Sequence, residues 1–308
     1  MGIKLVVAIT DSDWYEFLRY RRDLTEVNFW APGGGVQFRA LQRGELLLFK
    51  LHAPRNFIVG YGIFAHPSIL PCSLAWESFG EANGAGSFSE MRRRIARYRH
   101  VSADTREDFA IGCRILTQPV FFDESGWIPV PTSWSPQTQR FKTFDATAGD
   151  GLRLWEAIQD AGTSKGLEPG LTESPARYGA PTLIQPRLGQ GGFRVMVTDN
   201  YHRRCAVTGE RTLPALDAAH IRPYSEGGGH SPRNGLLLRK DIHSIFDAGY
   251  ATVTPDLRFE VSCKIKEDFE NGRDYYALHG RGLIPPPTRD AWPDPSLLKW
   301  HNEVVYRG

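Results

Sequence analysis

Residues 217–253 read DAAHIRPYSEGGGHSPRNGLLLRKDIHSIFDAGYATV, and this stretch carries the clearest pattern in the chain. A strand is predicted over 216–221, and the apolar LLLRK segment at 236–240 is predicted to form a second one. A loop rich in glycine, serine and proline joins the two. DIHSIFDAG then opens a predicted helix that ends at Gly249. The expected order is therefore strand, loop, strand and helix.

Four polar residues occupy defined places in this pattern: His220, Asn234, His243 and Asp247. His243 and Asp247 are four residues apart, so on a helix their side chains share one face. An imidazole and a carboxylate at that spacing can hold a divalent cation and leave positions open for a phosphate oxygen and water. His220, at the end of the first strand, can then deprotonate a water molecule. Asn234 can fix the tautomer of that histidine or orient the loop.

These residues, with the CAVTGE segment upstream, resemble the HNH nucleases of the ββα-metal type, and most of all the restriction-endonuclease branch with an Ala-His-Ile motif. The resemblance covers roughly residues 190–262. It implies that His220 is the general base and that Asn234 orients the base or its loop. It implies that His243 is a metal ligand and that Asp247 is a further ligand. The implied cofactor is a divalent metal, Mg²⁺ first, with Mn²⁺, Ni²⁺ or Co²⁺ as alternatives.

The sequence departs from this family at the residue before the base. Many relatives have Asp or His there as a metal ligand, whereas this chain has Ala219. Asp217 is a candidate replacement, although on a regular strand its side chain would share the face of Ala219 and not that of His220. The missing acidic ligand also leaves open a decayed, non-catalytic HNH fold that only binds nucleic acid.

The cysteines give no sign of structural zinc. Many relatives hold zinc with two CxxC pairs, but here Thr208 stands where the partner of Cys205 would be, and no cysteine flanks His243. We expect Cys205 to be a buried small hydrophobe, with no structural zinc. The four cysteines form no close pair, which argues against a disulfide framework and fits a reducing, cytoplasmic setting.

The length of 308 residues predicts about two domains of an α+β protein. We expect a recognition domain over 1–145, a helix plus linker over 146–192, and the nuclease domain over 193–308. In the first domain, strands are predicted at 3–9, 36–41, 45–51, 57–64, 110–117 and 119–122, with helices at 13–22 and 88–99. Many short strands with few helices indicate a bent sheet or a barrel.

The segment NFWAPGGGVQFRALQRGELLLFKLHAPRNFIVGYGIF, residues 28–64, resembles the PUA-like superfamily, which includes EVE, YTH and SRA-type domains. That resemblance implies nucleic-acid binding, often with a flipped modified base held in an aromatic cage. Enclosing a flipped base requires apolar walls. Trp30 and Trp76 are the candidate walls because both lie next to loops, although buried tryptophans are usually core residues.

A net charge of +2 excludes a histone-like basic coat but not local basic faces. The densest basic run is Arg92, Arg93, Arg94, Arg97 and Arg99. On a helix, Arg93 and Arg97 share a face that can meet phosphates, or can simply be solvated. Arg222 is a third candidate phosphate contact.

Together these patterns favour a metal-dependent DNA endonuclease, and most specifically a modification-dependent restriction enzyme acting on double-stranded DNA. The alternatives are an HNH nuclease acting on RNA or serving as an effector or toxin, and the decayed binder. Cutting both strands would need two sites, so a homodimer is plausible. No apolar run approaches the roughly 18 residues of a membrane span, so no membrane partner is expected.

Overall fold

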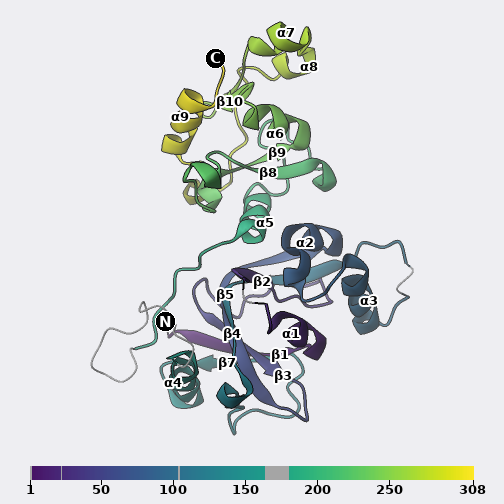
Figure 1. The fold of residues 1–308 in the computed structure, drawn as a ribbon, viewed down its shortest axis with the longest axis vertical. Coiled ribbons are helices and arrows are strands. Elements are labelled where there is room, and N and C mark those ends of the chain that lie inside the picture. Colours follow the sequence, from purple (N-terminus) through teal and green to yellow (C-terminus); the bar gives the residue numbers. More distant parts are fainter. Residues whose placement is uncertain (1, 22, 103–104, 164–179) are drawn as a thin grey trace. The chain divides into compact units, whose positions relative to one another are not determined.

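The protein, seen here in a computed structural model, is described over residues 2–21, 23–102, 105–163 and 180–308. It divides into two compact units, Met1–Gly189 and Gln190–Gly308. Both units combine strands with helices, which confirms the α+β class (Figure 1). No helix within these described ranges is both long and apolar enough to cross a bilayer.

One mixed sheet organises the first unit. Its strands are β1 (Lys4–Thr10), β2 (Glu26–Asn28), β3 (Leu46–Leu51), β4 (Phe57–Pro71), β5 (Ala110–Phe121), β6 (Ile128–Pro129) and β7 (Phe141–Asp145). Their order is β2-β5-β4-β3-β1-β7, with β6 on β4, and only β1 and β3 pair in parallel. The register between β4 and β5 shifts twice, as happens at β-bulges, which bend and twist a strand pair.

Helices cover both faces of this sheet. They are α1 (Ser12–Leu18), α2 (Cys72–Phe79), α3 (Phe88–Arg99) and α4 (Gly149–Thr163). Alternate residues of β1 belong to two different apolar clusters, one on each face of the sheet. Val6 packs with Trp14 of α1, whereas Leu5 and Val7 pack with Trp155 of α4. A sheet buried on both faces explains why β3 reads LLLFKL, an almost unbroken apolar run.

Four local expectations for this unit need correction. Residues 36–41 form no strand, because Phe38 and Leu41 are buried as anchors of an irregular segment. The strands expected at 110–117 and 119–122 are one strand, β5. The helix expected over 13–22 ends at Leu18, and α2 was not predicted at all.

The second unit has the expected order of strand, loop, strand and helix. Its elements are α5 (Gln190–Asn200), β8 (Leu216–His220), β9 (Gly235–Arg239), α6 (Lys240–Asp247), β10 (Ala251–Val253), β11 (Phe259–Val261), α7 (Lys264–Phe269), α8 (Arg273–Tyr276) and α9 (Pro295–Val304). β8 and β9 form an antiparallel pair, and both α5 and α6 pack against that pair. β10 and β11 form a second antiparallel pair.

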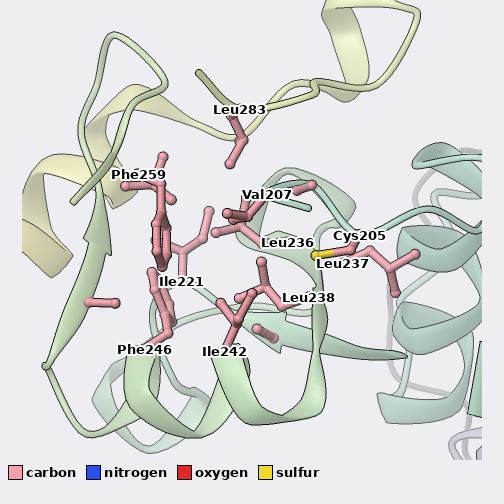
Figure 2. Close-up of a cluster of buried hydrophobic side chains, with 14 of the residues drawn as sticks. Cys205, Val207, Ile221, Leu236, Leu237, Leu238, Ile242, Phe246, Phe259 and Leu283 are labelled. Carbon is pink, nitrogen blue, oxygen red and sulfur yellow. The ribbon is translucent and has the colours of Figure 1, made fainter. Parts of the chain in front are cut away.

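A single apolar cluster holds these elements together. In Figure 2, Ile242 and Phe246 of α6 point into the same cluster as Leu238, Ile221 and Phe259. Cys205 is fully buried in this cluster, as expected of a small hydrophobe (Figure 2). The cluster fixes α6 against the strand pair, so the polar side chains of both are held at defined positions.

Candidate active site

A cavity of about 550 Å³ in the second unit collects most of the polar residues singled out by the sequence. His220, His243, Asp217 and Asp247 all line it. They come from β8 and from α6, two elements that the core holds together. One strand and one helix thus bring together side chains that are up to 30 residues apart in the chain.

His220 is held flat against Phe193 of α5. The two rings are stacked with centroids 3.8 Å apart and planes 12° apart. Helix α5 can lie this close to His220 because its partner across the strand pair is Gly235. A Cβ at position 235 would lie 2.4 Å from Val197 and 2.9 Å from Phe193. Burial, with a contribution from the neighbouring His230, lowers the pKa of His220 to about 4. His220 is therefore neutral at pH 7 and able to accept a proton.

His230 is a site residue that sequence reasoning did not single out. Its Nδ1 lies 3.2 Å from Nε2 of His220. Its ring stacks on Tyr224, with centroids 5.2 Å apart and planes 6° apart, and both residues line the cavity. The signal that could have found it is its position in the loop that joins β8 to β9, between His220 and Asn234.

His243 lies between two carboxylates. Its Nδ1 is 3.3 Å from Asp217 Oδ2, and its Nε2 is 3.1 Å from Asp247 Oδ2. Burial alone would lower the pKa of His243, but the hydrogen bonds and charges of the two aspartates raise it to about 9. Without a metal, the imidazole is therefore protonated at pH 7 and shared by both carboxylates.

Asp217 reaches the cavity although strand alternation placed it on the face of Ala219. Ala219 is fully buried, whereas Asp217 is half-buried, contacts His243 and lies 3.9 Å from Arg194 Nε. In the part of the chain that the structure describes, β8 pairs only with β9, so the contact of Asp217 is made with α6 and not with a third strand. Against the effect of burial, His243 and Arg194 lower the pKa of Asp217, so it is a carboxylate.

The donor set fits a small divalent cation. His243 Nε2 and Asp247 Oδ2 are 3.1 Å apart, close to the separation of neighbouring ligands bound at ~2.1 Å to one ion. Asp217 meets the other ring nitrogen, the place where a carboxylate usually orients a metal-binding histidine. Within the described residues, no group of three His, Cys, Asp or Glu side chains already converges as a metal site.

Comparison with known proteins agrees with this geometry. Residues 205–254 match the family model HNH_2, described as an HNH endonuclease. This segment is an HNH endonuclease domain. The match contains His220, Asn234, His243 and Asp247. The protein is accordingly a nuclease.

Beyond the HNH domain the comparisons say less. No curated protein matches the chain significantly. Among the solved structures that match is one titled "Modification dependent TagI restriction endonuclease", at 14% identity and a TM-score of 0.29, covering 97% of this chain and 81% of that one. A likeness with so low a TM-score carries no conclusion about the rest of the fold.

Asn234 stabilises the loop of the HNH domain, and its side-chain hydrogen bonds go to the loop backbone and not to His220. Its side chain is buried, its Oδ1 accepts from the amide of Arg222 at 2.9 Å, and its Nδ2 donates to the carbonyls of Arg222 at 2.8 Å and Gly229 at 2.9 Å. Of the two functions expected for this residue, orienting the loop is therefore the one that the contacts support.

We expect Asn234→Ala to destabilise the HNH domain by about 2–3 kcal/mol, because the three hydrogen bonds between its buried side chain and the loop backbone are lost. Chemical denaturation of the full chain measures this loss. Asn271→Ala, which removes an exposed amide from the same unit, is the control and should change stability by less than about 0.5 kcal/mol. An equal effect of the two substitutions would contradict the loop-stabilising function.

The candidate phosphate contacts lie in different settings. Arg93 and Arg97 are exposed on α3 of the first unit, and Arg97 lies 3.7 Å from both Asp11 and Asp13. Arg222 lies next to the HNH cavity but is already engaged: its Nε donates to the Glu226 carbonyl at 2.6 Å. Its guanidinium also covers the Trp300 ring at 5.1 Å. The arginine that lines the HNH cavity is Arg194, which sequence reasoning did not single out.

The two candidate base-pocket tryptophans also lie in different places. Trp30 lines a cavity of about 670 Å³ in the first unit and donates through its indole to the Asn83 carbonyl at 2.9 Å. Trp76 does not line that cavity and instead lies against Phe88, with ring centroids 6.3 Å apart. The structure therefore does not bring Trp30 and Trp76 together in one pocket.

Proposed function

We propose that the protein is a metal-dependent DNA endonuclease that reads a modified base with its first unit and hydrolyses phosphodiesters with its HNH domain. The observation that carries the proposal is the HNH cavity, where the neutral imidazole of His220 faces the same space as the His243–Asp247 pair. Hydrolysis of a phosphodiester needs a proton acceptor for water and positive charge for the phosphate.

His220 takes the proton from the attacking water. When its Nε2–H donates to His230, its Nδ1 lone pair is left to accept that proton. Phe193 keeps the ring in place, since the stacked geometry allows little tilting. Arg194, on the same cavity, adds positive charge for the phosphate.

His243 Nε2 and Asp247 would hold the cation, while Asp217 accepts the Nδ1–H of His243 and fixes the direction of the ring. A bound Mg²⁺, or Mn²⁺, Ni²⁺ or Co²⁺ in its place, would stabilise the charge that develops on the phosphate and leaving oxygens. Asp217, the candidate third ligand, would thus act on the cation through His243. An acidic residue at position 219 is not required in this arrangement, which supports an active enzyme over a decayed binder.

The first unit is the proposed reader of double-stranded DNA. Its aromatic cavity, lined by Trp30, supports this function, as does the resemblance of residues 28–64 to the PUA-like superfamily. A restriction enzyme of this kind cuts both strands, so we propose that two copies act together as a homodimer. Its proposed setting is the cytoplasm.

Cleavage assays with the full chain test the proposal. Purified protein is incubated with unmodified plasmid DNA, with phage DNA carrying modified cytosines, and with RNA of similar length, each with Mg²⁺, Mn²⁺ or EDTA. We expect cutting of DNA only with a metal and faster cutting of the modified DNA. Cutting of RNA alone would favour the alternative substrate, and no cutting under any condition would refute the enzyme assignment.

A further inference from the structure

The cavity of the first unit combines aromatic walls with a positive charge. Trp14, Phe29, Trp30, Phe38 and Tyr98 all line it, and so does Arg114. Its volume of about 670 Å³ is in the ordinary range of small-molecule pockets. A planar, apolar-faced ligand with a polar edge is the kind of group that such walls enclose.

Arg114 has no acidic partner. It lies on β5, and within the described residues no carboxylate comes within ion-pair distance of its guanidinium. Its Nε is buried without a hydrogen-bond partner. The guanidinium instead lies 4.7 Å from the Phe38 ring centroid and 5.8 Å from that of Phe29. Leaving a cation partly buried and unpaired is costly unless something else completes its hydrogen bonds.

The neighbouring charges do not compensate Arg114. Arg39 and Arg140 line the same cavity and are exposed, which places them where it opens to solvent. Burial, with a smaller effect of Arg140, lowers the pKa of Arg114 to about 10, so its charge persists at neutral pH. Asp11 also lines the cavity, but its carboxylate accepts from the Trp14 amide and the Tyr98 hydroxyl.

We infer that Arg114 decides which base this cavity accepts, and that it selects guanine or cytosine by donating to two adjacent acceptors on one edge of the base. The inference rests on the proposed DNA substrate and adds which bases are accepted. Guanine offers N7 and O6, and cytosine offers N3 and O2. Adenine places an amino group beside N7, and thymine places an N–H between its carbonyls, so neither offers two adjacent acceptors.

The exposed arginines fit the same occupant. A base that leaves the duplex brings its own phosphates to the opening of the pocket, where Arg39 and Arg140 can contact them. A C5 substituent on cytosine leaves N3 and O2 unchanged, so recognition by Arg114 is compatible with a modified cytosine.

The test is binding of the full chain, in EDTA, to duplexes that carry one G, C, A or T opposite an abasic site. No base pair has to be broken in these duplexes, so binding reports the pocket. Fluorescence anisotropy should show the G or the C duplex bound about tenfold or more tighter than the A and T duplexes. Arg114→Met and Arg114→Lys should reduce this preference to less than about twofold, because neither side chain presents two donors in a fork.

Arg153→Met is the matched control, since Arg153 is exposed, lies on α4 and does not line the cavity. It should keep the base preference. Thermal unfolding separates recognition from packing: Arg114→Met should melt at or above the temperature of the wild type, because an unpaired cation is removed. A melting temperature lowered in Arg114→Met would make Arg114 a packing residue and overturn the inference.

Equal binding of the four duplexes by the wild type, or a preference that survives Arg114→Met, would also overturn it. Cleavage with Mg²⁺ or Mn²⁺ is measured separately on the same duplexes. Cutting without base preference would refute the pocket and leave the nuclease proposal standing. Base preference without cutting would support the pocket and refute the nuclease proposal.

Discussion

His220→Ala is expected to lower the rate of DNA cleavage by about 10²- to 10⁴-fold, the usual contribution of a general base. His220 is the neutral imidazole of the HNH cavity, and its pKa of about 4 keeps it unprotonated throughout the physiological range. DNA affinity measured in EDTA should change little, because the substitution removes no positive charge. Single-turnover cleavage at saturating metal is the measurement.

Two further results distinguish loss of a base from loss of structure. Added imidazole should restore part of the activity of His220→Ala, since it can enter the open cavity and accept the proton. His202→Asn, a substitution of an exposed histidine that does not line the cavity, should cleave like the wild type. A His220→Ala variant that keeps most of its activity would exclude His220 as the base.

The parts of the site that the sequence predicts are those fixed by local geometry. Residues four apart on a helix share a face whatever surrounds them, so the pairing of His243 with Asp247 followed from spacing alone. The strand, loop, strand and helix order followed from apolar runs and turn residues in the same way. Asn234 was predicted to orient either the base or its loop, and only its three hydrogen bonds distinguish the two.

The parts that the sequence did not predict depend on contacts through space. Asp217 contacts His243 of the neighbouring helix, which alternation along one strand cannot show. His230 and Phe193 meet His220 because a loop and a helix converge on it, and Gly235 makes room for that helix. The sequence does not distinguish Arg114 from other strand residues. Its aromatic neighbours, and the buried Nε that has no hydrogen-bond partner, follow only from the structure.

Metal affinity is expected to rise with pH, because a proton and a cation compete for His243. The pKa of this imidazole is about 9 in the metal-free protein, where Asp217 and Asp247 hold its protonated form. Binding a cation at Nε2 near neutral pH must therefore release one proton. Below that pKa, the apparent affinity for Mn²⁺ should increase about tenfold for each pH unit.

Calorimetry of Mn²⁺ binding between pH 6.5 and 8, in buffers with different ionisation enthalpies, measures both the affinity and the released proton. His243→Ala should lose the binding, and Asp217→Asn should bind with a weaker pH dependence, because it removes one of the two carboxylates that raise the pKa of His243. His279→Ala, outside the cavity, should behave like the wild type.

The metal-free protein should show the opposite trend: its stability should fall as the pH rises. The raised pKa stabilises the fold fully below the unfolded value of about 6.5, and this contribution disappears as the pH rises through about 9. Binding of Mn²⁺ that is independent of pH and releases no proton would place the cation away from His243.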